Sequence, residues 1–318
     1  MQELWRWGTD IILGLQIIHN PALDIFFNIV TLLGGEVSYF LLLPFLYWCV
    51  DKNLAQRLAY LLLFSVYSNA ALKNLFRHPR PFRYDPRVQN LSVEPAEVLR
   101  YGLPSGHSQM AVAVWGYLAT QVHRQWVRVL AVALMILVPF SRIYLGVHFP
   151  TDVLAGLIIG AMWLGLFLLI EPRLEPWLAR QPAGVQIALA VIVPTILLVL
   201  HSSRDAVAAM ATLIGIGIGI VIEGRTLRFS VGGPVWQRVL RFLIGVLVVL
   251  ALRAGLALVF PAEGEKLYVV FRTVRYSVVG LWVTLIAPWV FQQLRLIEST
   301  QKHVISTNGR NPRSGTSD

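Results

Sequence analysis

Charged residues are scarce in this chain: aspartate, glutamate, lysine and arginine make up 14% of its 318 residues, whereas hydrophobic residues make up 56%. A soluble domain of this size seldom has such a composition, so the balance favours a protein surrounded by lipid. Basic residues outnumber acidic ones and give a formal net charge of +10. They are scattered over the loops and form no stripe interleaved with aromatic residues, so we expect no nucleic-acid partner.

Cysteine is almost absent. The single cysteine, Cys49, lies in an apolar stretch and cannot form a disulfide within the chain, so we expect it to be a small packing residue. The first seven residues contain Glu3 and two tryptophans, but no basic start followed by a small-residue cleavage site. This pattern differs from a secretory signal peptide, and we expect the N-terminus to be retained.

Hydrophobic runs long enough to cross a bilayer recur along most of the chain. The first part has six, near 22–34, 37–50, 56–76, 106–122, 127–145 and 151–171, and the part after a polar segment has four, near 184–202, 206–223, 238–261 and 276–292. We therefore predict an all-α, polytopic transmembrane bundle with ten spans. Its expected parts are an N-terminal interfacial segment (1–20), a six-helix core (21–171), additional transmembrane helices (184–292) and a disordered cytoplasmic tail (293–318).

Two of three chemistry-bearing motifs place cations and backbone donors at predicted span ends. The first runs from Lys73 through Arg80 to Pro81 and fixes two cations near a membrane boundary, where they favour an anion or, more commonly, lipid headgroups. The second, Pro104-Ser105-Gly106-His107, leads into a helix. Backbone N–H groups at a helix start form an anion cradle, and Ser105 adds a hydroxyl donor; the same four residues also suit an ordinary N-cap turn.

The third motif places a histidine close to a carboxylate. It comprises Ser141-Arg142, then His148, then Asp152, with Pro150 suited to the first turn of a helix. Asp152 can orient the imidazole of His148 as a nucleophile, although an isolated pair at this spacing is more often structural.

Counting spans places all three motifs on one membrane face, where they can converge. Together they supply three cations, amide donors, a histidine backed by a carboxylate and a second histidine that can protonate a leaving group. Phosphoryl transfer requires these parts: charge stabilisation, an aligned nucleophile and an acid.

In these three motifs the sequence resembles the type-2 phosphatidic acid phosphatase superfamily of lipid phosphatases and phosphotransferases. The resemblance covers roughly residues 20–171 and all three motifs match without gaps. The residues around the motifs, including Tyr47-Trp48, Asp51 and Tyr101-Gly102-Leu103, look most like the sphingosine-1-phosphate phosphatase branch.

The resemblance implies a role for each motif residue. His148 would carry a phosphohistidine intermediate, Asp152 would orient it, and His107 would act as the acid. Phosphate would be held by Lys73, Arg80, Ser105, Gly106 and Arg142. Neither a metal nor another cofactor is implied, and the partners would be the bilayer and a lipid phosphate dissolved in it.

Three functions are compatible with this pattern. We expect an integral membrane lipid phosphatase that hydrolyses a phosphate monoester or diphosphate. The alternatives are a lipid phosphotransferase that uses the same phosphohistidine and a non-catalytic transporter or scaffold with a relic site. The sequence identifies neither the lipid nor the oligomeric state.

Some residues outside the motifs also carry expectations. Gly215, Gly217 and Gly219 lie in one apolar run and predict close helix packing. Arg253 lies inside a predicted span, where a charge indicates an ion pair or a functional group. His78 belongs to no motif, and we keep it as a candidate supporting group.

The distribution of basic residues predicts the orientation. Setting aside the motif cations and Arg253, eight lysines and arginines fall on the catalytic face and fifteen on the other. The positive-inside rule then predicts, for a bacterial inner membrane, an active site facing outside and cytoplasmic termini.

A cysteine introduced at Asn90 tests this orientation. We expect a membrane-impermeant thiol reagent to label it in intact cells, because Asn90 lies on the predicted outer face. The chain carrying only Cys49 is the control, and labelling that appears only after permeabilisation would reverse the orientation.

Overall fold

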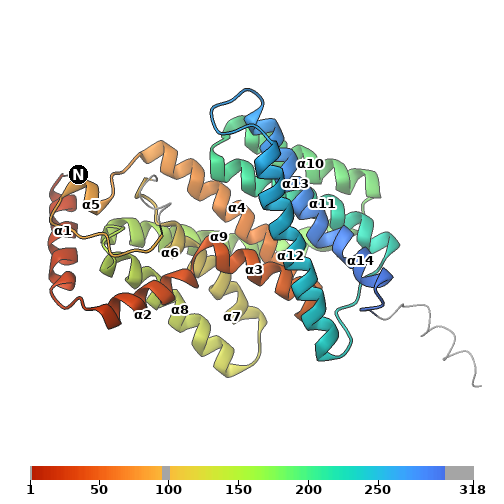
Figure 1. Ribbon diagram of the computed structural model, residues 1–318, viewed down its shortest axis with the longest axis horizontal. Coiled ribbons are helices and arrows are strands. Elements are labelled where there is room, and N and C mark those ends of the chain that lie inside the picture. Colours follow the sequence, from red (N-terminus) through yellow and green to blue (C-terminus); the bar gives the residue numbers. More distant parts are fainter. Residues whose placement is uncertain (1, 95–100, 298–318) are drawn as a thin grey trace, which may run out of the picture.

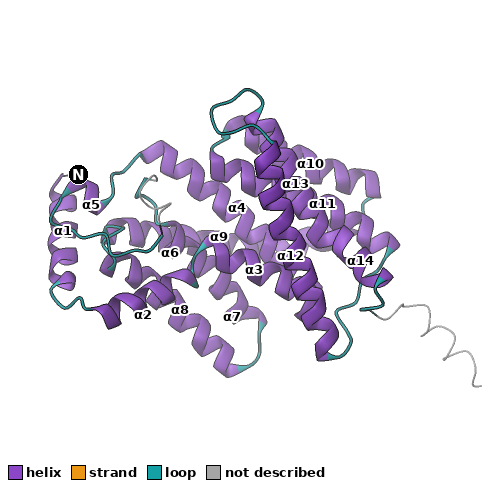
Figure 2. Ribbon diagram, in the orientation of Figure 1, coloured by secondary structure: helices purple, strands orange, loops and turns teal. Residues whose placement is uncertain are grey.

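The computed structural model describes residues 2–94 and 101–297, and this part of the chain contains helices and connecting segments without any β-strand (Figures 1 and 2). The predicted all-α fold is confirmed. The N-terminal half comprises α1 (Gln2–Gln16), α2 (Pro21–Leu32), α3 (Glu36–Phe45, with a π-helical turn to Val50), α4 (Lys52–Phe76), α5 (Pro81–Tyr84), α6 (Gly106–Met110, with a π-helical turn to Gly116), α7 (Tyr117–Gln121), α8 (Gln125–Tyr144) and α9 (Pro150–Ala179). The C-terminal half comprises α10 (Ala183–Leu200), α11 (Arg204–Thr226), α12 (Val235–Val259), α13 (Tyr268–Leu281, with a π-helical turn to Ile286) and α14 (Ala287–Gln293).

The molecule is elongated, with α1, α2 and α8 near one end and α10, α11 and α14 near the other (Figure 1). Helix α1 runs across the end of the bundle rather than along it. Its tight packing explains this position, since a β-carbon at Gly8 would lie 2.8 Å from Cδ1 of Phe149, the residue that precedes α9.

Several helices are suited to cross a membrane. By length and composition, six described helices pass this test, and the bent pair α2–α3 would make a seventh. The predicted spans 22–34 and 37–50 form this pair, which is bent by 48°. The chain is therefore a multi-pass membrane protein. Its described residues provide up to seven passages by length and composition, whereas ten were expected.

The differences have physical causes. A bend of 48° does not reverse the chain, so α2 and α3 continue in broadly the same direction. Helix α4 carries Lys52, Arg57 and Lys73 and a run of polar residues, which lowers its mean hydropathy. The continuous helical segment 106–121 has too few residues to meet the length used for a span.

The two ends of the described chain lie at opposite ends of the bundle. Helix α1 contacts the motif end, where Gln16 donates to the carbonyls of Gln89 and Tyr144. At the other end, the Leu296 side chain is buried in the same core as Trp48. The expectation that both termini lie opposite the motifs therefore differs from the structure, because α2 and α3 make one bent passage rather than two.

The expected disordered tail also begins too early. Predicted to start at residue 293, it includes Leu296, which packs into the core with an exposed fraction of 5%. A backbone hydrogen bond of 2.8 Å from its N–H to the carbonyl of Phe291 holds it there. The remainder of the predicted tail, residues 298–318, lies outside the described residues.

Glycines bring helix backbones into contact at two places. Helix α9 lies directly on α6, since a β-carbon at Gly156 or Gly160 would be 2.5 Å from the carbonyl oxygen of Ser105 or Gln109. Helix α11 lies equally close to α13, where β-carbons at Gly215 and Gly219 would fall 2.0 Å from neighbouring oxygens. The predicted close packing of the C-terminal glycines is confirmed.

Polar contacts join the C-terminal helices to the N-terminal half at the end away from the motifs. Lys52 forms a 3.0 Å ion pair with the buried carboxylate of Glu223 in α11. The indole of Trp48 donates to the carbonyl of Val283 at 2.8 Å, and the Tyr47 hydroxyl donates to that of Thr284. The two halves therefore share one core.

The α6–α9 contact gives a paired stability prediction. Gly160→Ala should lower the thermal stability of the purified protein in detergent, because the added methyl group meets a backbone oxygen and such overpacking costs about 1–3 kcal/mol. Gly165→Ala in the same helix is the control, because a β-carbon there meets nothing within 4 Å. Equal melting temperatures for the two variants would contradict the close packing.

Candidate active site

The first motif lies at the end of α4 and in the segment that follows. Lys73 is in the last turn of α4, which ends where Arg77 adopts a left-handed conformation (φ 48°). Arg80 precedes the short helix α5 and its side chain is fully buried. Its Nη1 donates to the carbonyl of Val147 at 2.9 Å and to Nε2 of His148 at 3.0 Å. The first and third motifs are therefore in direct contact.

The second motif forms the start of α6. Ser105 is its N-cap, and its hydroxyl oxygen accepts from the N–H and hydroxyl of Ser108. The Ser105 N–H in turn donates to the backbone carbonyl of Asp152 at 2.9 Å. From α4, Asn69 donates to the carbonyl of Pro104, and a β-carbon at Gly106 would lie 3.1 Å from its side-chain oxygen. The turn thus has the expected N-cap, and Gly106 in addition packs closely against Asn69.

The third motif spans the turn from α8 to α9. Arg142 lies in the last turn of α8, His148 in the connecting segment and Asp152 in the first turn of α9. His148 Nδ1 is 3.4 Å from Oδ2 of Asp152, and the same oxygen accepts the N–H of Phe149 at 3.1 Å. Gly146 makes the turn possible, because its φ is +71° and a β-carbon would lie 2.3 Å from the carbonyl oxygen of Gln89.

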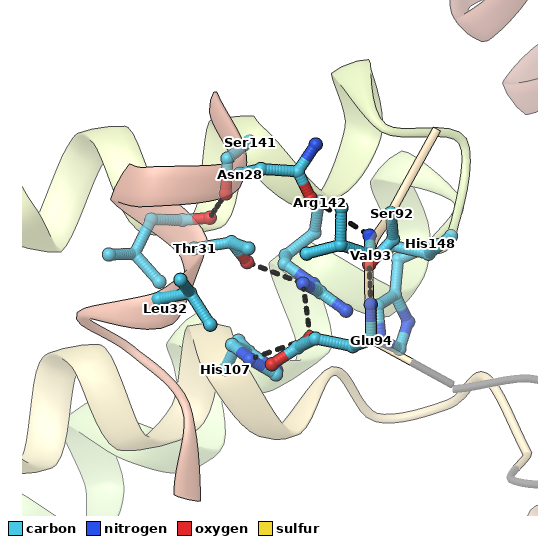
Figure 3. Close-up of polar contacts among 12 residues, drawn as sticks. Asn28, Thr31, Leu32, Ser92, Val93, Glu94, His107, Ser141, Arg142 and His148 are labelled. Atoms are coloured by element: carbon cyan, nitrogen blue, oxygen red, sulfur yellow. Dashed lines mark hydrogen bonds and ion pairs between the residues drawn. The ribbon is translucent and has the colours of Figure 1, made fainter. Parts of the chain in front are cut away.

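A carboxylate outside the three motifs lies between two motif residues, an arginine and a histidine. Glu94 Oε2 is 3.0 Å from Nη1 of Arg142 and 3.4 Å from Nε2 of His107 (Figure 3). The same Arg142 nitrogen donates to the hydroxyl of Thr31 in α2. Figure 3 shows Arg142 and His107 directed toward the Glu94 carboxylate from α8 and α6. One anionic oxygen therefore accepts a hydrogen bond from Arg142 and lies at ion-pair distance from His107.

The position of Glu94 depends on α2. Asn28 accepts the N–H of Val93 at 3.0 Å and donates to the carbonyl of Leu91 at 2.9 Å, so it holds the segment before Glu94 against the bundle. The position of Glu94 is difficult to predict from the sequence, because the segment between the first two motifs has no periodicity. Its position on the motif face was the only available signal.

The motif residues lie at one end of the bundle, as their spacing predicted. One connected group comprises Arg80, His148, Asp152 and Ser105. A second comprises His107, Arg142 and Glu94, and it adjoins the first because His107 follows Ser105 and Gly106 along the chain. All of Arg80, Ser105, Arg142, His148 and Asp152 have fully buried side chains. Burying so many polar groups at a membrane end costs free energy. Such clusters are therefore usually found at functional sites.

Two regions of the chain match models of known families. Residues 54–176 match the PAP2 superfamily, and residues 207–301 match the transmembrane extension of the PAP2 superfamily phosphatases. The chain belongs to the PAP2 superfamily. The PAP2 domain contains all three motifs, whereas α1, α2 and α3 precede it.

Several known proteins are similar to this chain. The chain is 31% identical to lipid phosphate phosphatase delta of Arabidopsis thaliana, over 55% of this chain and 44% of that protein. It is 32% identical to mouse sphingosine-1-phosphate phosphatase 2, over 48% of this chain and 43% of the relative. The chain is 24% identical to mouse sphingosine-1-phosphate phosphatase 1, over 86% of this chain and 73% of that protein. The chain thus spans less than half the length of the first two relatives.

One solved structure is also similar. The crystal structure of LpxE from Aquifex aeolicus has 27% sequence identity and a TM-score of 0.45, over 50% of this chain and 93% of that one.

Glu94→Gln should strengthen the binding of inorganic phosphate to this PAP2 domain. The substitution removes a negative charge that competes with phosphate for Arg142 and His107, and we expect a decrease in Kd of about tenfold, equivalent to about 1.4 kcal/mol. Protection of the purified protein from thermal unfolding by phosphate provides the measurement. Glu36→Gln serves as the control, because Glu36 is exposed and pairs with Arg253. Unchanged or weaker binding in Glu94→Gln would show that phosphate does not bind at Arg142 and His107.

Proposed function

We propose that this protein is an integral membrane lipid phosphatase that hydrolyses a phosphate ester through a phosphohistidine on His148. The observation that carries the proposal is the position of the Glu94 carboxylate between Arg142 and His107. An anionic oxygen there accepts a hydrogen bond from Arg142 and lies at ion-pair distance from His107, as a phosphate oxygen would. The site next to it contains an imidazole oriented by a carboxylate, which is the arrangement of an activated histidine nucleophile.

The protonation pattern around His148 supports its role as the nucleophile. Arginine only donates hydrogen bonds, so the 3.0 Å contact with Arg80 requires a lone pair on His148 Nε2. The proton of the neutral ring is then on Nδ1, which faces Asp152. Nε2 is therefore the nitrogen that would attack phosphorus.

The first half-reaction transfers the phosphoryl group to the protein. The Nε2 lone pair forms a bond to phosphorus while the bond from phosphorus to the lipid oxygen breaks. His107 donates a proton to that oxygen, and the lipid alcohol leaves. Lys73, Arg80 and Arg142, together with the Ser105 and Gly106 turn, would stabilise the phosphate charge.

The second half-reaction returns the protein to its starting state. Water loses a proton to His107 as its oxygen bonds to phosphorus, the bond from phosphorus to Nε2 breaks, and inorganic phosphate is released. An alcohol in place of water would give phosphotransfer through the same intermediate. The proposed steps use protein cations alone and require no metal ion.

The relatives suggest a class of substrate. Two of them are sphingosine-1-phosphate phosphatases and another is a lipid phosphate phosphatase. A phosphate monoester of a long-chain lipid would sit with its apolar part in the bilayer and its phosphate at the motif end. We therefore propose a lipid phosphate monoester, with sphingosine 1-phosphate as the first compound to test.

The distribution of charge supports an orientation with the motif end outside. Counting α1 at that end moves Arg6 to the catalytic face, which leaves nine lysines and arginines there and fourteen on the opposite side. The positive-inside rule still favours a cytoplasmic location for the opposite end. We propose that the N-terminal segment 1–20 lies along the outer surface and that the C-terminus is cytoplasmic. The core (21–171) would carry the reaction, and the additional helices (184–292) would flank it.

Phosphate release by the purified protein tests the proposed function. The assay compares sphingosine 1-phosphate, phosphatidic acid, phosphatidylglycerol phosphate and an isoprenoid phosphate in detergent micelles that contain EDTA. We expect inorganic phosphate from at least one lipid, and a competing alcohol separates hydrolysis from transfer. Release from none of them, with a folded protein, would contradict the proposal.

The two histidines should be distinguishable by substitution. His148→Ala should abolish turnover and acid-labile phosphate labelling of the protein, because it removes the attacking nitrogen. His107→Ala should slow substrates with a poor alkoxide leaving group most, and aryl phosphates least, because an aryl oxide departs without a proton. Rapid-quench trapping measures the label in each case. Labelling that persists in His148→Ala, or an equal effect of His107→Ala on both substrates, would reverse the assignment.

A further inference from the structure

A buried polar chain connects the first helix to the proposed nucleophile. In α1, the indole N–H of Trp5 donates to Nε2 of His78, whose side chain is 4% exposed. The other nitrogen of His78, Nδ1, lies 3.0 Å from Oδ1 of Asp152. Neither of these two buried atoms makes an aligned hydrogen bond within the described chain, so the 3.0 Å contact joins them at ion-pair distance without hydrogen-bond alignment. The remaining oxygen of Asp152 faces His148.

Groups that can only donate determine where the protons lie in this chain. An indole nitrogen can only donate a hydrogen bond. Nε2 of His78 must therefore carry a lone pair, and the proton of the neutral ring is on Nδ1. At the other end, Arg80 fixes a lone pair on Nε2 of His148 in the same way. Both imidazoles thus face Asp152 with a protonated Nδ1, which lies 3.0 Å from Oδ1 for His78 and 3.4 Å from Oδ2 for His148.

We propose that His78, with its tautomer fixed by Trp5, is a positioning residue that orients Asp152 and through it His148. The proposal rests on the proposed function, in which His148 is the nucleophile. A neutral donor at His78 fixes the carboxylate in place and leaves its negative charge available to His148. An imidazolium in the same place would share that charge and weaken the effect of Asp152 on the nucleophile.

Packing keeps Trp5 and His78 in place. Their rings meet edge to face with centroids 5.0 Å apart, and Tyr84 packs against Trp5 at 5.2 Å. Phe149 contacts both His78 and Tyr84. Trp5 therefore belongs to the site although it lies far outside residues 54–176, which match the PAP2 superfamily.

Two substitutions at His78 separate the donor from the ring. In His78→Asn the amide nitrogen takes the place of Nδ1, so a donor to Asp152 remains, whereas in His78→Gln the amide lies nearer the position of Nε2. With sphingosine 1-phosphate in micelles, we expect kcat to fall about 10- to 100-fold in His78→Gln with little change in KM, as for other groups that orient a functional imidazole. His78→Asn should recover most of that loss. Equal losses in both variants, or none in His78→Gln, would overturn the proposal.

Trp5→Phe tests the control of the tautomer and needs no change at His78. Phenylalanine keeps the aromatic packing but removes the N–H, so Nε2 of His78 becomes free to take a proton. We expect the acid limb of kcat/KM to move to higher pH, which a merely structural role would not cause. Trp7→Phe is the control, because Trp7 lies on the same helix and is exposed. An acid limb that coincides with the wild type would overturn the role of Trp5.

His148→Ala distinguishes failure of this inference from failure of the proposed function. If His148→Ala keeps wild-type turnover, the function itself is wrong. If it is inactive while His78→Gln and Trp5→Phe behave as wild type, the positioning role alone is wrong. Should His78→Gln fail to fold, as judged by thermal unfolding, the pH profile of Trp5→Phe decides.

Discussion

The arrangement of the site depends on compensating one buried carboxylate, Asp152. Its side chain is fully buried, and an isolated charge in such surroundings would be very unfavourable. Two imidazoles and one backbone N–H surround it, and a β-carbon at Gly102 would lie 2.8 Å from Oδ2. The segments that carry His78, Gly102 and His148 must therefore all reach the start of α9. The convergence of motifs that are distant in sequence follows from this requirement.

The position of Asp152 in turn depends on backbone contact between α6 and α9. The carbonyl of Asp152 accepts the N–H of Ser105, and Gly156 and Gly160 then keep α9 against α6 for two further turns. Small residues permit this approach, which side chains would prevent. The turn at Ser105 and Gly106 and the carboxylate are consequently fixed by one helix pair. The site therefore does not depend on loop structure alone.

The fold class and the meeting of the three motifs could be predicted from the sequence. Long apolar runs indicate helices in lipid. Residues such as Arg80 and Asp152 could be recognised as candidate site residues from their type and spacing in the motifs. The bend between α2 and α3 could not be predicted, because two short apolar runs fit two spans as well as one bent passage. Glu94 and Trp5 were missed for another reason. Each acts through contacts across the fold, and neither belongs to a local pattern.

The contact between Trp5 and His78 also constrains the order in which the protein can be completed during synthesis. Chains are made from the N-terminus. Helix α1 is therefore finished long before Asp152 exists, and the contact partner of Trp5 lies 73 residues further along the chain. The first helix must wait, unpaired on this face, while at least α2 to α4 are synthesised. His148 and Asp152 are thus added only after α8, beside a helix that was made first.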